Sequence, residues 1–167
     1  MDQKVENLSV VIPVYNDQEV IQELYRRLHP VLEEIATNYE VVLVDDGSKD
    51  DSWNEILRLR DIDEHIVAVK LARNFGQQNS IAAGLNVAMG DIVVLMDSDL
   101  QDRPEDIPTL IDTLLKSGAS MAIAQWQTRQ DTWAKRTVSN IFNRVSNTIT
   151  SIHIAPHLGV FRAIRHS

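Results

Sequence analysis

The stretch Asp91-Ile-Val-Val-Leu-Met-Asp-Ser-Asp-Leu-Gln-Asp-Arg-Pro-Glu105 decides the fold that this sequence predicts. Its first part, Ile92 to Met96, is a short apolar run rich in β-branched residues, which is typical of a strand buried on both faces of a parallel sheet. Asp97, Ser98 and Asp99 follow directly. In open parallel α/β sheets, ligands bind outside the carboxyl ends of the strands. The stretch therefore predicts both a buried strand and the binding edge of its sheet.

Two interpretations of these acidic residues are open at this point. Asp97 and Asp99 are two positions apart, so in an extended chain both carboxylates leave the same face and could hold Mg²⁺ or Mn²⁺, which prefer oxygen ligands. Alternatively, the Asp-x-Asp-x-x-Asp pattern caps a helix that Pro104 and Glu105 begin, because Asp is favoured at the N-cap and Pro in the first turn. The local pattern supports both.

Strand-like and helix-like segments alternate as far as Trp126. Apolar runs predict strands at Leu8–Val14, Glu40–Val44, Ile66–Leu71, Ile92–Met96 and Met121–Trp126. Helical spacing predicts helices from Asp17 to about Thr37, from Asp51 onward, from Gln78 to Met89 and from Pro104 to Lys116. We expect Asp17 to cap the first helix, Pro30 to kink or divide it, and Gly90 to stop the third. The alternation predicts an α/β fold with a Rossmann-like, mostly parallel sheet flanked by helices.

Polar residues gather at three predicted strand ends, Tyr15-Asn16-Asp17, Asp45-Asp46-Gly47-Ser48 and Asp97-Ser98-Asp99. Carboxylates on one rim repel one another, so the folded protein should supply a cation or hydrogen-bond donors there, which favours the metal interpretation over capping. The glycine-rich dinucleotide fingerprint and the Walker A sequence are both absent. Phosphate is therefore expected to be bound through a metal.

Length and composition favour one soluble domain. The chain has 167 residues, 44% of them hydrophobic and 24% charged, with no cysteine, which excludes disulfides and thiolate zinc sites. The N-terminus, Met-Asp-Gln-Lys-Val-Glu, does not resemble a secretory signal, and no apolar run approaches the roughly 20 residues of a membrane span. We expect a protein that is not exported.

The formal charge of −8 is unevenly distributed. Residues up to Thr128 contain 10 Lys and Arg against 23 Asp and Glu, a net of −13, whereas Arg129 to Ser167 contain 6 against 1, a net of +5. The acidic part contains the predicted metal site, and the basic part would suit a phosphorylated or membrane-surface partner. Chance variation between short segments is the alternative.

Five segments occur in a fixed order across residues 8–105. They are Ser9-Val-Val-Ile-Pro-Val-Tyr-Asn16, Val44-Asp-Asp-Gly-Ser48, Leu71-Ala-Arg-Asn-Phe-Gly76, Ala83-Gly-Leu85 with Gly90-Asp91, and Met96-Asp-Ser-Asp-Leu-Gln-Asp102 with Pro104-Glu105. Together they resemble the inverting, family 2 type glycosyltransferases of the GT-A fold, and within these the polyprenyl-phosphate and dolichyl-phosphate sugar transferases. The resemblance implies transfer of a sugar from a UDP- or GDP-sugar to a polyprenyl phosphate, with anomeric inversion and with Mg²⁺ or Mn²⁺ as cofactor. It also implies a place at the cytoplasmic face of the membrane, with peripheral membrane contact and no nucleic-acid partner.

The resemblance also assigns residues to a site. The nucleotide-sugar residues would be Pro13, Tyr15, Asp17, Val44, Asp45, Asp46, Asp97 and Ser98. Asp99 with Gln101 would hold the metal, and Asp99 and Arg129 would be catalytic, because both a metal and a nearby cation neutralise charge on the departing nucleotide. A packed ring for Tyr15 and a solvated charge for Arg129 are the alternatives.

The C-terminal part departs from the family. Relatives tend to place a basic residue directly after the fifth strand, but here Gln125-Trp-Gln-Thr128 precedes Arg129. A basic helix predicted from Thr132 to about Ile149 would suit a lipid phosphate. The segment His157-Leu-Gly-Val-Phe-Arg162 lacks the acidic residue that relatives often carry, so no general base is assigned. Gly159–Ile164 is a possible sixth strand with no helix after it, from which we expect a fold truncated at its C-terminal side.

We therefore expect one glycosyltransferase domain over residues 1–167. Residues 8–128 would form its nucleotide-sugar and metal-binding half, and residues 129–167 a partial acceptor-side segment. Three rivals remain. A truncated, inactive nucleotide-sugar-binding remnant would show neither donor hydrolysis nor transfer. A nucleotidyltransferase would need a glycine-rich, basic motif after the first strand, and a phosphoacceptor signalling domain would need a Lys where Leu71 to Gly76 offers Arg-Asn.

Overall fold

The computed structural model describes residues 4–125 and 158–166. The chain forms two compact units, residues 1–123 with 160–167 and residues 124–159. The candidate site lies within the first unit. Arg129, His157 and the predicted basic helix lie outside the described residues, so the roles expected of Arg129 and of that helix stay predictions.

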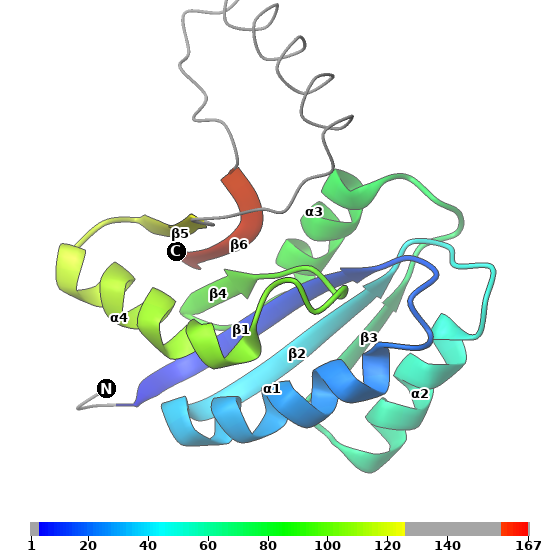
Figure 1. The fold of residues 1–167 in the computed structure, drawn as a ribbon, viewed down its shortest axis with the longest axis horizontal. Coiled ribbons are helices and arrows are strands. Elements are labelled where there is room, and N and C mark those ends of the chain that lie inside the picture. Colours follow the sequence, from blue (N-terminus) through cyan, green and yellow to red (C-terminus); the bar gives the residue numbers. More distant parts are fainter. Residues whose placement is uncertain (1–3, 126–157, 167) are drawn as a thin grey trace, which may run out of the picture. The chain divides into compact units, whose positions relative to one another are not determined.

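The predicted alternation of strands and helices is confirmed (Figure 1). The elements are β1 (Val5–Val14), α1 (Ile21–Ile35), β2 (Ala36–Asp45), α2 (Ser52–Ile62), β3 (Ile66–Lys70), α3 (Gln77–Val87), β4 (Ile92–Leu95), the 3₁₀ helix η1 (Pro104–Asp106), α4 (Ile107–Ser117), β5 (Met121–Gln125) and β6 (Leu158–Arg165). The possible sixth strand is thus present as β6.

The strands form one sheet in the order β3-β2-β1-β4-β6-β5. β1 pairs in parallel with β2 and β4, and β2 pairs in parallel with β3. β6 runs antiparallel to β4, with Arg162 opposite Leu95. The sheet is therefore mixed but mostly parallel, and the carboxyl ends of β1, β2, β3 and β4 share one edge.

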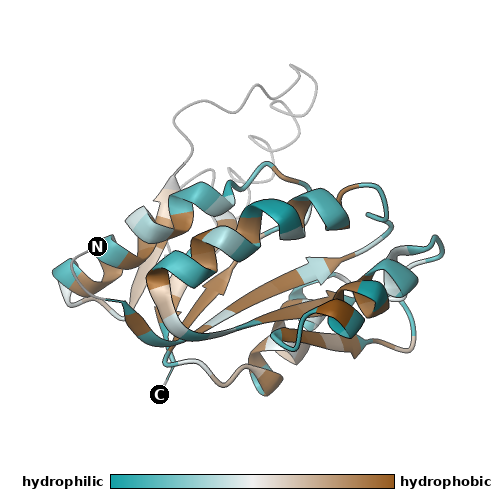
Figure 2. Cartoon of the chain, turned by 90° about the horizontal axis from the view of Figure 1, so that it is seen from below, coloured by the Kyte–Doolittle hydropathy of each residue, from teal (hydrophilic) through white to brown (hydrophobic). Residues whose placement is uncertain are grey.

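Helices cover both faces of the sheet because the chain reverses direction across it. It moves from β1 out to β3 through α1 and α2, and it returns from β3 to β4 through α3. Right-handed crossovers then place α3 on the face opposite α1 and α2. Figure 2 shows apolar strands between helices that carry both apolar and polar stripes. The apolar stripe of α1 comprises Ile21, Leu24, Leu28, Leu32 and Ile35.

Three local expectations were wrong. Val20, not Asp17, occupies the N-cap of α1, because the Asp17 carboxylate instead accepts hydrogen bonds from the Tyr15 N–H and the Ser98 hydroxyl. Pro30 does not divide helix α1, because it lies inside one continuous helix. Helix α3 ends before Gly90, whose N–H donates to the Ser9 hydroxyl at 2.8 Å and where a Cβ would lie 2.5 Å from the Ser9 nitrogen. Gly90 therefore allows the chain to pass close to β1.

Helix α3 packs closely on the sheet at Gly84. A Cβ on Gly84 would overlap Val11 Cγ1 and would lie 3.1 Å from Val44 Cγ2, both in fully buried side chains. The absence of a side chain at Gly84 therefore sets the distance between α3 and the strands β1 and β2.

We predict that Gly84→Ala destabilises the protein by about 1–3 kcal/mol, because the added methyl group forces a well-packed core apart. Urea unfolding followed by circular dichroism measures the change. Asn86→Ala, at an exposed position of the same helix, is the matched control and should change the free energy of unfolding by less than about 0.5 kcal/mol. Equal stability of Gly84→Ala and wild type would contradict this packing.

Helix α1 is also tied to η1, the segment that follows the acidic loop 97–102. Arg27 donates from Nε and Nη2 to the two oxygens of Glu105, at 2.9 and 2.6 Å. These bonds lower the pKa of Glu105 from its ordinary 4.5 to about 2. A carboxyl group with a lowered pKa stabilises the folded state above its ordinary pKa, and this contribution is lost as the pH falls toward 2.

We predict that Arg27→Met lowers the free energy of unfolding at pH 7 only slightly, because the Glu105 side chain is 41% exposed and solvent screens the pair. The deficit should shrink at pH 3, where Glu105 of the variant is protonated in both states. Urea unfolding at the two pH values tests this. Lys4→Met, which removes a cation bonded to the Glu33 backbone carbonyl, is the control and should show no such pH dependence. A deficit that does not change with pH would refute the assignment.

Candidate functional site

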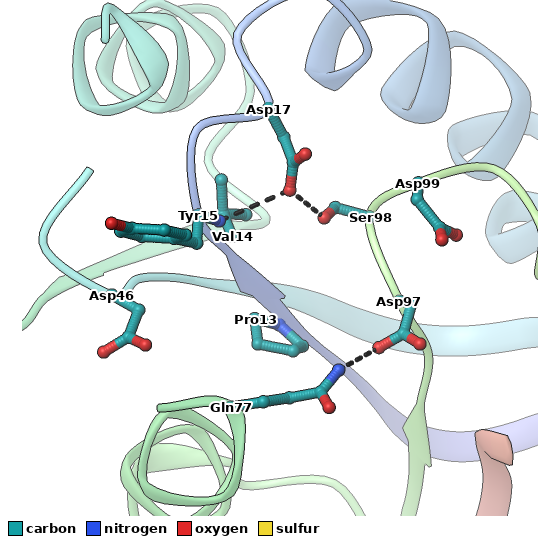
Figure 3. A pocket seen from close by; sticks show the side chains of 9 residues that line it. All are labelled: Pro13, Val14, Tyr15, Asp17, Asp46, Gln77, Asp97, Ser98 and Asp99. Carbon is teal, nitrogen blue, oxygen red and sulfur yellow. Dashed lines mark hydrogen bonds between the residues drawn. The ribbon is translucent and has the colours of Figure 1, made fainter. Parts of the chain in front are cut away.

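A cavity of about 200 Å³ lies at the carboxyl ends of β1, β2 and β4. It is lined by Pro13, Val14, Tyr15, Asp17, Asp46, Gln77, Asp97, Ser98 and Asp99 (Figure 3). The chain leaves β1 toward β2 on one side and later returns to β4 on the other, so the cavity lies at the topological switch point of the sheet.

The register of the strands creates this cavity. Leu95, the last residue of β4, pairs with Val11, whereas β1 continues to Val14 beside Asp45 of β2. The Met96 N–H donates to the Val11 carbonyl, so the backbone polar groups of Val11 point toward β4. The backbone of Pro13 points to the same side, because backbone direction repeats every two residues along a strand. Proline has no N–H to donate there, so the β1–β4 ladder stops and leaves a notch.

The turn after β1 is bonded to the turn after β2, which holds Tyr15 beside the notch. Asn16 adopts φ +57°, its N–H donates to the Ser48 hydroxyl at 3.0 Å, and its Oδ1 accepts the Lys49 N–H at 2.8 Å. The Asp17 N–H donates to the Ser52 hydroxyl at 2.9 Å. The Tyr15 side chain remains 40% exposed, and its ring forms one wall of the cavity (Figure 3).

Asp45 and Asp46 have different environments although they are adjacent. Asp45 is fully buried: its Oδ1 accepts the Ser48 N–H at 3.1 Å, and its Oδ2 has no hydrogen-bond partner among the described residues. Asp46 lines the cavity while its two oxygens accept the N–H groups of Phe75 and Gly76, at 2.8 and 2.9 Å. Its carboxylate therefore binds the loop before α3 to the end of β2.

Gly47 makes this junction possible. It adopts φ +68°, and a Cβ there would lie 2.5 Å from the Arg73 carbonyl carbon. Only a residue without a side chain fits between the two backbones in this conformation.

The acidic loop turns instead of continuing β4. The Asp97 N–H donates to Asp102 Oδ2 at 2.9 Å, the Gln101 N–H donates to Asp99 Oδ1 at 3.0 Å, and Leu100 lies in the left-handed region at φ +62°. The expectation of an extended Asp97-Ser98-Asp99 segment was therefore wrong. The capping alternative was wrong too, because Arg103 and Asp106 occupy the N-caps of η1 and α4 without side-chain capping bonds.

Two hydrogen bonds join the acidic loop to the rest of the rim. The Ser98 hydroxyl donates to Asp17 Oδ2 at 2.5 Å, and Gln77 Nε2 donates to Asp97 Oδ1 at 2.6 Å (Figure 3). Asp99 is exposed at the cavity edge. The rim thus combines an aromatic wall at Tyr15 with carboxylates at the opposite end.

The structure brings most of the predicted site residues together. Those that line the cavity are Pro13, Tyr15, Asp17, Asp46, Asp97, Ser98 and Asp99. Val44 and Asp45 are fully buried and do not line it, and Gln101 is exposed beside Asp99 without lining it. Val14 and Gln77 line the cavity and were missed. The position of Gln77, at the start of the helix that follows β3, was the available signal, because helices begin at the same sheet edge where parallel strands end.

The donor set suits a hard divalent cation that also binds phosphate. Mg²⁺ is commonly held by one or two carboxylates together with waters and substrate phosphates. Asp97 and Asp99 supply such carboxylates at one end of the cavity. Within residues 4–125 and 158–166 no group of three or more His, Cys, Asp or Glu is placed to hold a metal by itself. The residues present fit a metal whose remaining ligands are waters or phosphate oxygens.

This sheet, with its acidic site at the switch point, defines a GT-A glycosyltransferase fold. Residues 9–166 match the family described as glycosyl transferase family 2. The chain belongs to that family.

Curated relatives agree with this assignment. The chain is 37% identical over 164 residues to the undecaprenyl-phosphate 4-deoxy-4-formamido-L-arabinose transferase of Proteus mirabilis (strain HI4320), covering 98% of this chain and 50% of that protein. It is 40% identical over 162 residues to the protein of the same name from Enterobacter sp. (strain 638), covering 96% and 49%. The chain thus spans about half the length of these relatives.

Solved structures share the fold. Glucosyl-3-phosphoglycerate synthase from Mycobacterium tuberculosis, crystallised with Mn²⁺, UDP and phosphoglyceric acid, matches with a TM-score of 0.68 at 20% identity, over 96% of this chain and 56% of that one. Residues 1–349 of S. aureus TarS match with a TM-score of 0.61 at 19% identity, over 95% and 47%. At these identities the likeness concerns the fold.

We predict that Asp46→Asn lowers the free energy of unfolding by about 1–3 kcal/mol, because the new amide group places a donor against one of the two N–H groups that Asp46 accepts. Asp99→Asn, in the same cavity but exposed, should change it by less than about 0.5 kcal/mol. Urea unfolding of the two variants makes the comparison. Equal effects would mean that Asp46 does not hold the loop 73–76.

Proposed function

We propose that this chain is the donor-binding part of a metal-dependent glycosyltransferase that binds a UDP- or GDP-sugar in the cavity at the switch point. The observation that supports the proposal is the composition of the rim, which has the exposed ring of Tyr15 on one side and the exposed carboxylate of Asp99 on the other (Figure 3). A base can stack on such a ring, and a diphosphate can reach carboxylates only through a cation.

Different residues of the cavity would bind different parts of the donor. Tyr15 supplies a flat apolar surface for the base, next to the wall that Asp46 holds in place. Asp97 and Ser98 face the nucleoside, and Asp99 with Gln101 is the ligand set for Mg²⁺ or Mn²⁺. A bound divalent metal would supply Lewis-acid stabilisation of the negative charge on the departing nucleotide. Arg129 is proposed as a further cationic contact to that leaving group.

The proposed acceptor is a polyprenyl phosphate, to which the sugar passes with anomeric inversion at the cytoplasmic face of the membrane. The names of the two curated relatives support this choice, because both are called undecaprenyl-phosphate 4-deoxy-4-formamido-L-arabinose transferase. The +5 net charge of residues 129–167 suits an anionic acceptor, and residues 8–128 would bind the donor and metal. In the part of the chain that the structure describes, no helix has the length and apolar character that a membrane crossing needs.

The test is calorimetric titration of UDP and GDP, each with and without Mn²⁺, into wild type and Asp99→Ala. We expect one of the two nucleotides to bind, at least about tenfold more tightly with Mn²⁺, which corresponds to about 1.4 kcal/mol. We expect Asp99→Ala to lose this metal effect, because one of the few metal ligands is gone. Asp106→Ala, an exposed acidic position on η1 outside the cavity, is the matched control.

Failure of both nucleotides to bind a protein that is shown to be folded would refute the donor site. Nucleotide binding that Mn²⁺ does not alter would refute the proposed role of the metal in binding the donor. Incubation with the nucleotide sugar and a polyprenyl phosphate then tests turnover: hydrolysis or transfer of the sugar excludes an inactive nucleotide-binding remnant, and neither would support that rival.

A further inference from the structure

Gln77 is the one hydrogen-bond donor side chain from helix α3 that lines the cavity among the residues described, and it has no role in the sequence motifs. It occupies the first position of α3, and its side chain extends toward Asp97 beneath Pro13 (Figure 3). Its Nε2 donates to Asp97 Oδ1 at 2.6 Å. A short bond from an amide to a carboxylate is stronger than one between neutral groups.

Because of the position of Gln77 in the chain, this bond connects parts of the site that come from different strands. The preceding residues, Phe75 and Gly76, donate their N–H groups to the Asp46 carboxylate at the end of β2. Asp97, on the far side of β1, donates its own N–H to Asp102. Hydrogen bonds at three consecutive residues, Phe75, Gly76 and Gln77, therefore connect the end of β2 to the acidic loop through the start of α3.

The two walls of the cavity come from strand ends that do not pair with each other. β2 and β4 are separated by β1, and the β1–β4 ladder has already ended at Val11. Asp97 therefore lies beyond the last backbone pairing of β4. Side-chain hydrogen bonds orient its carboxylate there. Ser98 anchors the next residue to Asp17, and Gln77 acts on Asp97 itself.

We infer that Gln77 is a positioning residue, which holds the Asp97 carboxylate in the orientation that the nucleotide donor requires and so couples the Asp46 wall of the site to the acidic wall. This inference rests on the proposed donor site. It requires a hydrogen-bond donor at position 77, because a carboxylate there would repel Asp97 and an apolar side chain would not make this bond.

The test uses two variants with side chains of similar length, the apolar Gln77→Met and the negatively charged Gln77→Glu. We expect Gln77→Met to weaken Mn²⁺-dependent UDP or GDP binding about tenfold, and Gln77→Glu to weaken it further, with unchanged thermal stability because position 77 is exposed. A side chain that only fills space predicts the reverse order, since Glu copies the shape of Gln more closely than Met does. Gln78→Met, at the next exposed position of the helix, is the matched control and should bind as wild type does.

The second measurement needs no nucleotide. The side-chain amide signals of Gln77, assigned by their loss in Gln77→Met, are followed by NMR in the unliganded protein. Asp97→Ala should move them, because it removes their acceptor. Asp99→Ala, in the same cavity, should leave them in place. Unmoved Gln77 signals in Asp97→Ala would overturn the inference whatever the binding data show.

The outcomes separate the two proposals. If wild type binds neither nucleotide, the donor site fails, and the positioning role fails with it even where the NMR signals confirm the bond. If wild type binds a nucleotide and Gln77→Met binds it equally well, the positioning role alone is refuted. Weaker binding in Gln77→Met than in wild type, still weaker binding in Gln77→Glu, and signals that move only in Asp97→Ala would together support it.

Discussion

The parallel pairing of β1 with both β2 and β4 is the constraint on which the rest of the structure depends. Val11 lies opposite Val42 on one side and Leu95 on the other, and all three side chains are buried in the core beneath α3. Because the strands run in the same direction, the polar residues that follow each of them arrive at one edge. The different lengths of the strands then separate these ends, and β4 stops three residues below the end of β1. The cavity follows from that offset and from the missing N–H of Pro13.

A rim with this many carboxylates needs donors, and the chain provides them from its own backbone and side chains. Asp46 accepts two N–H groups, Asp102 accepts the N–H of Asp97, and Asp17 accepts a hydroxyl and an N–H. These bonds satisfy acceptor oxygens of carboxylates that lie together at the sheet edge. They also use several of the acidic residues for loop structure, so Asp99, which is exposed, is the acidic side chain best placed to meet a ligand. Acidic residues of one motif therefore serve both the architecture and the site.

Much of the site was predictable because the relevant signals are local in sequence. A buried apolar run is followed by Asp97 and Asp99, and a second apolar run is followed by Asp45 and Asp46. This pattern predicts a sheet edge with clustered carboxylates. Seven of the predicted residues line the cavity. The errors arose where a side chain had a distant partner. Asp17 suits a helix cap by its local context, but its carboxylate bonds to Ser98, 81 positions away. Gly90 suits a helix stop, but its contact is Ser9.

The sequence by itself determined the class of fold and the family, because strand and helix periodicity, strand-end carboxylates and the order of the five segments are properties of the linear chain. Only the tertiary structure decided which residues meet. The register of β4 against β1 placed Asp97 beyond the last backbone pairing, and the return of α3 across the sheet brought Gln77 within 2.6 Å of it. No periodicity encodes a contact between residues 20 positions apart on different elements. The packing of α3 on the sheet at Gly84, with the loop bonded to Asp46, sets that distance.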